Sequence, residues 1–138
     1  MAISARNKLQ GRVSGIKPGE TMCLVILDAQ GTKIIAAVTN QNVQELNLKQ
    51  NDQVTAVIKS TEVMLMKGGG QATFSARNRF AGQIESIQKG EAMGLVTVTM
   101  GQFHLGAAIT REAIDEMGLK QGDQVTAVVK ETEVMLMK

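Results

Sequence analysis

The chain has 138 residues, a formal net charge of +2, 43% hydrophobic residues and 20% charged residues. This composition is typical of a globular protein with one ordinary domain or two very small ones, and it excludes an intrinsically disordered chain. The near-neutral charge argues against binding polyanions through bulk charge, and no apolar run reaches the ~18–20 residues that span a bilayer.

Three stretches in the first half of the chain have the composition of β-strands. Residues 6–16 form a weakly alternating strand, in which Gly11 and Gly15 indicate a bulge or a sharp bend. Residues 21–29 and 32–39 are β-branched or apolar runs on either side of the turn-like sequence DAQG. We therefore expect three consecutive strands.

A short helix and two further strands are expected next. Residues 39–52 begin with polar side chains, which predicts a helix of one or two turns capped by Thr39 or Asn40. Residues 53–60 alternate apolar and polar side chains, and residues 61–67 are apolar on both faces toward their end.

The second half of the chain repeats the first at an offset of 71 residues, which places Ser4 on Ser75. About half of the aligned positions are identical, and DQVTAVIKSTEVMLMK differs from DQVTAVVKETEVMLMK at only two. We expect two domains, 1–67 and 72–138, joined by a flexible Gly-rich linker at 68–71. Five strands with a small helix between the third and the fourth predict an all-β fold of two tandem OB-fold-like five-stranded β-barrels. Such small barrels have thin cores, so we expect the two units to pack together and chains to associate.

One group of polar residues in each repeat suits anion binding. Ser4 and Arg6 lie at the start of the first expected strand, and Lys59 and Ser60 lie at the end of the fourth. All four donate hydrogen bonds and two are cationic, which suits a tetrahedral dianion. No nucleophile–base pair can be assembled from the single Cys and the single His, so we expect a binding protein and not an enzyme.

The combined motifs resemble one known family. The order ISARNKLQGRV, AAVT and VTAVIKSTEVMLMK is similar to the molbindin (Mop) family of small molybdenum-pterin-binding-like proteins, whose domain is of the TOBE type. The resemblance covers nearly the whole chain, once per repeat, as in a two-domain (di-Mop) molbindin. It implies homotrimers that hold molybdate or tungstate, as an oxyanion and not as a metal cation, at interfaces between domains. It also implies cytoplasmic molybdate storage and homeostasis, with no cofactor and no nucleic-acid or membrane partner.

The resemblance further assigns oxyanion-binding residues by position. In the first repeat they are Ser4, Arg6, Thr39, Lys59 and Ser60, with Ala5 and Asn7 supplying backbone N–H groups or orienting the motif. In the second repeat they are Ser75, Ala76, Arg77, Asn78, Thr110, Lys130 and Glu131.

Glu131 departs from the pattern, because it stands where the first repeat has Ser60. Like-charge repulsion from its carboxylate would weaken an anion site that it faces. Either the second site is weaker, or only the backbone at position 131 is used, or sites combine Arg from one repeat with Lys from the other. The last two interpretations are favoured because family sites lie between domains.

Two alternative functions stay open. One is an oxyanion-dependent sensor or adaptor with a protein partner. The other is a nucleic-acid-binding module, since OB-type barrels often serve that purpose. The absence of Trp, Tyr and a basic stripe disfavours the nucleic-acid module.

Overall fold

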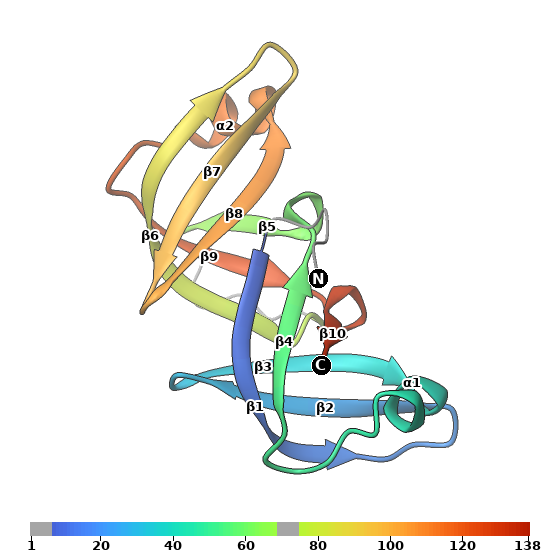
Figure 1. Cartoon of the computed structure of the whole chain (residues 1–138). Coiled ribbons are helices and arrows are strands. Elements are labelled where there is room, and N and C mark those ends of the chain that lie inside the picture. The colour runs from blue at the N-terminus through green and yellow to red at the C-terminus, as the bar shows by residue number, and fades with distance from the viewer. Residues whose placement is uncertain (1–6, 69–74) are drawn as a thin grey trace.

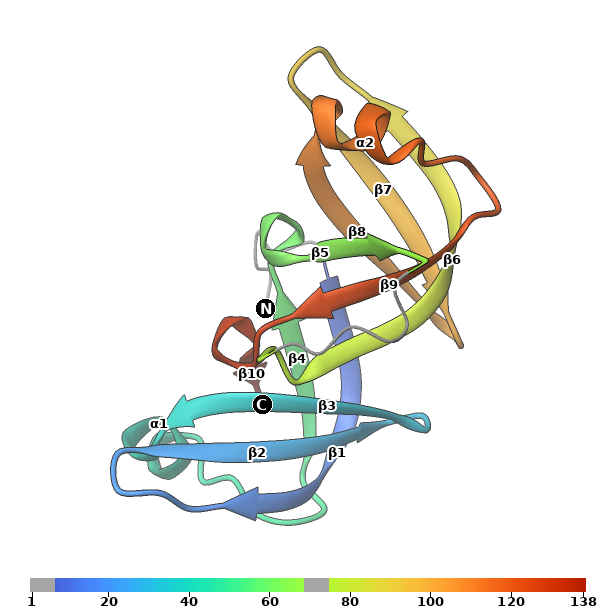
Figure 2. The same ribbon diagram turned by 180° about the vertical axis from the view of Figure 1, so that it is seen from behind.

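The computed structural model describes residues 7–68 and 75–138 (Figures 1 and 2). Within these residues the first repeat contains strands, a helix and a 3-10 turn: β1 (Asn7–Lys17), β2 (Met22–Ala29), β3 (Thr32–Thr39), α1 (Asn40–Glu45), β4 (Gln53–Ile58), η1 (Ser60–Glu62) and β5 (Met64–Lys67). The second repeat contains β6 (Asn78–Lys89), β7 (Met93–Met100), β8 (Phe103–Thr110), α2 (Arg111–Met117), β9 (Gln124–Val129), η2 (Glu131–Glu133) and β10 (Met135–Met137). The predicted all-β fold, with a short helix between the third and fourth strands of each repeat, is confirmed.

The strands form two curled five-stranded antiparallel sheets, each a half-barrel of the OB type (Figure 1). The sheet orders are β10-β4-β1-β2-β3 and β5-β9-β6-β7-β8. Each sheet therefore takes four strands from one repeat and its fifth strand from the other. The two sheets do not coincide with the two sequence repeats.

A 3-10 turn sends each exchanged strand across the molecule. After β4 the chain turns at η1, where the Glu62 N–H donates to the Lys59 carbonyl, and it continues as β5 along β9. The second repeat does the same at η2, and β10 pairs with β4 so that Leu136 lies opposite Ala56. Figure 2 shows β5 beside β9 in the upper half and β10 near β4 below it. The predicted strands 53–60 and 61–67 are both present but shorter, because a 3-10 turn at Ser60–Glu62 separates them. The alternation of side chains in the sequence did not indicate this turn.

Two buried asparagines join the halves through hydrogen bonds that mimic strand pairing. The Asn7 side chain accepts from the Gly106 N–H at 2.7 Å and donates to the Gly106 carbonyl at 2.8 Å. Asn78 makes the equivalent pair with the N–H and carbonyl of Ile35, at 2.7 Å and 2.8 Å. Their exposed fractions are 4% and 1%. Each SARN asparagine therefore satisfies the backbone of the third strand of the opposite repeat.

Two lysines at the ends of the exchanged strands hold those strands in place. Lys67 donates to the Met117 and Gly118 carbonyls at the end of α2 and lies 3.2 Å from Asp123. Lys138 likewise donates to the Asn47 carbonyl and lies 3.0 Å from Asp52.

The aspartates that meet these lysines have lowered pKa values. A hydrogen bond from Lys138, followed by one from the Lys49 N–H, lowers the pKa of Asp52. The Lys120 N–H, followed by the Lys67 ammonium, lowers the pKa of Asp123. Each carboxylate therefore stabilises a loop of its own repeat and a strand of the other.

The main hydrophobic core runs through both repeats. It joins Leu9, Val25 and Ile58 of the first repeat to buried side chains of the second, among them Phe80, Leu105 and Val134. A smaller cluster around Ile84, Val96 and Ile114 lies in the second repeat. The expected packing of the two units against each other is confirmed, and it stabilises sheets that would have thin cores alone.

Local predictions in each repeat are also met. The register of β1 against β2 shifts between Val13 and Gly15, which is the expected bulge, and β6 shifts at the matching place. The Thr39 hydroxyl accepts from the Asn42 N–H at 3.1 Å and so caps α1. Thr110 caps α2 in the same way.

Candidate functional site

The structure describes most of the residues assigned by position. Ser4, Ala5 and Arg6 lie outside the described residues. Asn7 and Asn78 are buried in the contacts between repeats, so their side chains are committed to backbone groups.

Three of the assigned residues of the second repeat meet at one pocket. Ser75, Ala76 and Lys130 line a pocket of about 550 Å³ together with Val128 and with Met64, Leu65 and Met66 of β5. Ala76 is buried, whereas Ser75 and Lys130 are exposed. The pocket thus combines a hydroxyl and an ammonium group with an apolar wall.

The apolar wall of this pocket comes from the other repeat. Met64, Leu65 and Met66 belong to β5, which crosses from the first repeat to pair with β9. From the sequence, Met64 and Met66 are expected to pack in the core or at an interface, and the partner strand β9 is not predicted. The sequence feature that could have indicated this crossing is TEVMLMK, which is apolar on both faces and ends both repeats.

Arg77 and Glu131 approach each other at the same end of the second repeat. Arg77 Nε lies 3.9 Å from Glu131 Oε2. The Arg77 side chain is 63% exposed and that of Glu131 19% exposed. The carboxylate is therefore directed toward the guanidinium of its own repeat.

Ser60 lies against the opposite repeat. It begins η1 and lines a pocket of about 410 Å³ with residues of β6, β7 and β8, including Lys89 and Gly90. The preceding Lys59 is exposed. Ser60, which occupies the position equivalent to Glu131, is thus half-buried between the repeats.

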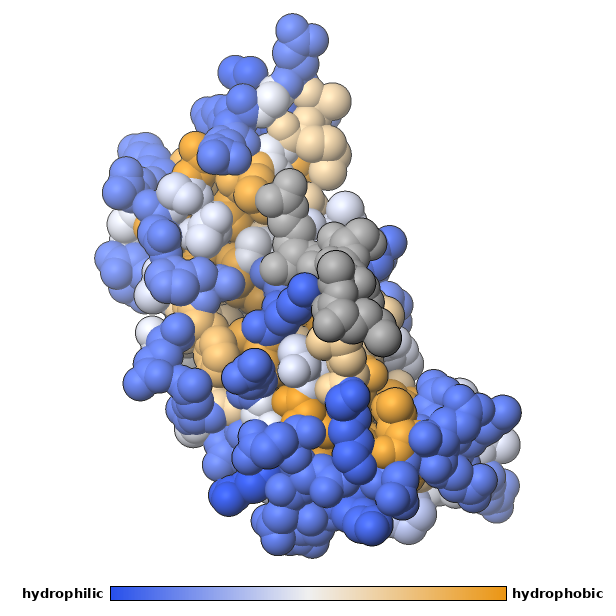
Figure 3. Space-filling model, viewed as in Figure 1, coloured by the Kyte–Doolittle hydropathy of each residue, from blue (hydrophilic) through white to orange (hydrophobic). Residues whose placement is uncertain are grey.

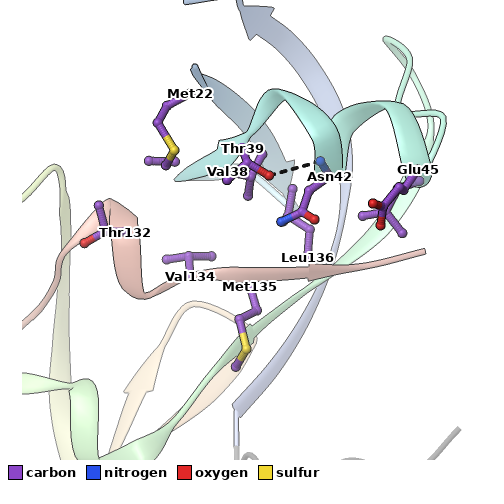
Figure 4. Close-up of a pocket in the computed structure, with 11 residues that line it drawn as sticks. Met22, Val38, Thr39, Asn42, Glu45, Thr132, Val134, Met135 and Leu136 are labelled. Carbon is purple, nitrogen blue, oxygen red and sulfur yellow. Dashed lines mark hydrogen bonds between the residues drawn. The ribbon is translucent and has the colours of Figure 1, made fainter.

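The two threonines are helix caps, and their surroundings do not favour an anion. Thr39 lines a pocket of about 430 Å³ between the repeats, where Thr132, Val134 and Leu136 of the second repeat face the start of α1 (Figure 4). Glu45 is the one charged residue in the lining. A dianion there would meet a carboxylate and no cation.

Thr110 lies in an acidic hollow. Glu91, Glu112, Asp115 and Glu116 line it with Arg111, and both Arg111 (3.6 Å) and Lys89 (3.0 Å) pair with Asp115. Hydrogen bonding from Lys89 lowers the pKa of Asp115, so this carboxyl stays ionised. Within one chain, the structure does not bring Thr39 or Thr110 to the pocket of Ser75 and Lys130.

The described residues, 7–68 and 75–138, include neither a membrane-spanning helix nor a cluster of metal-ligating side chains. None of the helices there is both long and apolar enough to cross a membrane. No three His, Cys, Asp or Glu side chains in these ranges lie close enough together to hold a metal cation.

A model of the TOBE domain matches residues 3–65 and, separately, residues 75–136. The chain belongs to the TOBE domain family. Each sequence repeat corresponds to one TOBE domain match, and the resemblance to molybdenum-pterin-binding proteins seen in the sequence is confirmed by the relatives below.

The fold of the two TOBE repeats occurs in a solved structure over its whole length. The cytoplasmic molybdate-binding protein ModG, with molybdate bound, superposes with a TM-score of 0.95 at 34% sequence identity. The match covers 99% of this chain and 99% of that chain.

Curated relatives match either both TOBE repeats or one. The molybdenum transport protein ModE of Herbaspirillum seropedicae is 33% identical over 138 residues, which cover 99% of this chain and 51% of ModE. Molybdenum-pterin-binding protein 1 of Clostridium pasteurianum is 46% identical over 67 residues, which cover 48% of this chain and 98% of that protein. The chain therefore spans about half the length of ModE, whereas one TOBE repeat corresponds to a whole small protein.

Proposed function

We propose that this chain binds molybdate or tungstate, as the oxyanion, at sites between TOBE repeats, and that it stores and buffers the ion in the cytoplasm. The observation that carries the proposal is the likeness to molybdate-bound ModG, which extends over 99% of both chains. The serine, arginine and lysine that recur in each repeat supply the hydrogen-bond donors, and Ser75 and Lys130 of the second repeat line one pocket.

A tetrahedral dianion needs several charge-assisted hydrogen bonds. Hydroxyl, ammonium, guanidinium and backbone N–H groups all donate to oxyanion oxygens. Each charge-assisted bond contributes roughly 1.5–3 kcal/mol. Four or five of them reach about −8 kcal/mol after the cost of association, which corresponds to micromolar binding. With no catalytic pair beside them, these groups hold the ion without transforming it.

We propose that the sites are completed by association of chains, as a homotrimer. Met22, Met64, Met93 and Met135 are exposed by 42–48% and occupy equivalent positions in the two repeats. Figure 3 shows apolar patches on the upper half and near the junction of the halves, above a mostly hydrophilic lower end. A repeated set of exposed large apolar side chains is typical of a surface that a partner covers.

A sensor or adaptor is the second candidate, and one observation favours it. The chain matches ModE at 33% identity over only 51% of ModE, so this pair of TOBE repeats also occurs as part of a longer protein. A chain acting in that way would bind a protein partner only when loaded with the oxyanion, whereas a storage protein would need no such partner.

Equilibrium binding tests the main proposal. Molybdate uptake is measured with sulfate and phosphate as competitors, on protein whose oligomeric mass is determined in the same buffer. We expect saturable uptake by a trimer that excess sulfate does not abolish. A failure to bind molybdate saturably would refute the proposal.

A double variant tests the residues. Arg6→Ala combined with Arg77→Ala is expected to abolish uptake while the fold persists, because both repeats lose their guanidinium groups. Arg12→Ala, which removes an exposed arginine of β1 away from the proposed sites, is the matched control and should bind as the wild type does. Retained uptake by the double variant would contradict the assignment.

A further inference from the structure

The two repeats differ in charge at one place that matters for an anion. Of the sixteen residues in their closing segments, 52–67 and 123–138, only two differ, and one difference replaces Ser60 by Glu131. The first repeat therefore has a hydroxyl where the second has a carboxylate.

The structure shows where that carboxylate points. Glu131 is the first residue of η2, and its side chain is 19% exposed. Its Oε2 lies 3.9 Å from Arg77 Nε, and its backbone neighbour Lys130 lines the pocket that Ser75 also lines. A carboxylate at this place gives the guanidinium a negative partner without any bound ligand.

A bound dianion and this carboxylate would compete for the same guanidinium. Carboxylate and oxyanion oxygens present the same acceptors to an arginine, so one displaces the other. Because Glu131 is tethered, its local concentration near Arg77 is high and independent of the ligand concentration. A dianion that did enter would also lie close to the displaced carboxylate and be repelled by it.

We define the clamp of the second repeat as Ser75, Arg77 and Lys130, and that of the first repeat as the corresponding residues together with Ser60. We propose that Glu131 is a built-in counter-ion that prevents divalent oxyanions from binding at the second clamp, so that only the first clamp binds them. This inference rests on the proposed function, because it assigns the ligand of that function to one of two related clamps. Glu131 acts as a specificity-determining residue, and the chain binds fewer oxyanions than its two SARN motifs would allow.

A charge-exchange set of variants tests the inference on the full-length protein. Molybdate stoichiometry and affinity are measured by equilibrium dialysis for the wild type, Glu131→Ser, Ser60→Glu and the double exchange. Glu131→Gln, which removes the charge and keeps the size, is the matched control. Thermal unfolding of each variant without molybdate shows whether the fold is kept.

The expected stoichiometries and affinities distinguish the effect of the carboxylate charge from a change in the fold. Glu131→Ser adds a second class of sites, bringing the stoichiometry to about twice the wild-type value, and Glu131→Gln opens the same class at about ten-fold or more weaker affinity. Ser60→Glu removes the wild-type class. The double exchange restores the wild-type stoichiometry, because it moves the carboxylate from one clamp to the other.

Two results would overturn the inference, and they can be distinguished. If the wild type binds molybdate and a folded Glu131→Ser variant binds it with unchanged stoichiometry and affinity, Glu131 does not close a clamp, although the proposed function stands. If neither the wild type nor any of the variants binds molybdate, the proposed function fails and the inference fails with it.

Discussion

The two repeats share one scaffold and differ at particular positions within it. Positions that join the halves are identical: Asn7 and Asn78 pair with the opposite third strand, and Lys67 and Lys138 hold the exchanged strands. The clamp position differs, with a serine in one repeat and a carboxylate in the other. The halves are therefore equivalent in these joining contacts and differ in charge at this one position.

A second difference shows how the scaffold absorbs change. Cys23 is buried in β2 and its thiol donates to the Asn40 side chain at 2.8 Å. Gly94 stands at the equivalent position of β7, and the Cδ1 atom of Ile114 from α2 fills the space beside it. The first repeat has Val43 at the position that corresponds to Ile114. The larger strand residue of the first repeat is thus accompanied by a smaller helix residue.

The largest expected effect comes from breaking one exchanged strand. Leu136→Asp places a charge in the half-buried segment of β10 opposite Ala56 and should lower the free energy of unfolding by about 2–4 kcal/mol. Hydrogen exchange should accelerate in β4, in the other repeat. The mirror variant, Leu65→Asp, should accelerate exchange in β9. If Leu136→Asp loosened β9 in place of β4, each repeat would keep its own last strand and the exchange would be refuted.

A smaller loss is expected from the asparagine contacts. Asn78→Ala leaves the Ile35 N–H and carbonyl without their side-chain partner and should cost about 2–3 kcal/mol of unfolding free energy. Asn7→Ala should cost a similar amount through Gly106. Chemical denaturation of both variants measures this. Equal losses support equivalent roles, whereas a negligible loss from either variant would show that its contact does not join the halves.

Substitutions at Gly94 and Ile114 should have coupled effects on the free energy of unfolding. A Cβ added at Gly94 would meet Ile114 Cδ1 and would lie 3.1 Å from the Gln88 carbonyl oxygen. Gly94→Ala should therefore cost about 1–2 kcal/mol. Adding Ile114→Val removes the clashing atom, so the double variant should lose less than the sum of the two single losses. Strict additivity, measured by chemical denaturation, would mean that these two positions do not compensate.

The smallest expected effect is on stability in acid. The pKa values of Asp52 and Asp123 are lowered in the folded protein, so their contribution is fully present above the unfolded pKa of about 3.9 and is lost as the pH falls through the lower folded values. Replacing both by Asn should flatten the decline of unfolding free energy below about pH 4. The exposed Glu20→Gln is the control. If the unfolding free energy of the double variant declined in acid as steeply as that of the wild type, the role of these aspartates would be contradicted.

Much of this architecture could be predicted from the sequence, because the relevant signals are local. Alternation, turn residues and the caps at Thr39 and Thr110 specify the strands and helices within each repeat. The exchange of β5 and β10 could not be predicted, because TEVMLMK is identical in both repeats and pairs equally well with β4 or β9. Only the path of the chain through η1 and η2 decides which partner it meets.

The candidate site shows the same limit. The repeated motif assigned Ser75 and Lys130 to one site, and the structure brings both to one pocket. The apolar wall from β5 arrives through the strand exchange, so no local pattern could place it there. The direction of the Glu131 side chain also depends on the turn η2 and not on the residue type alone. Oxyanion binding at the sites that the repeated motif assigns stays a prediction.

The most direct test of the central claim is the location of molybdenum in crystals of the loaded protein, by anomalous scattering at the molybdenum absorption edge. We predict a peak beside Lys59 and Ser60, at the junction with the opposite repeat, and none between Arg77 and Glu131. Peaks of equal height at both clamps would contradict the role of Glu131. The absence of any peak near either SARN motif would contradict the assignment of the site itself.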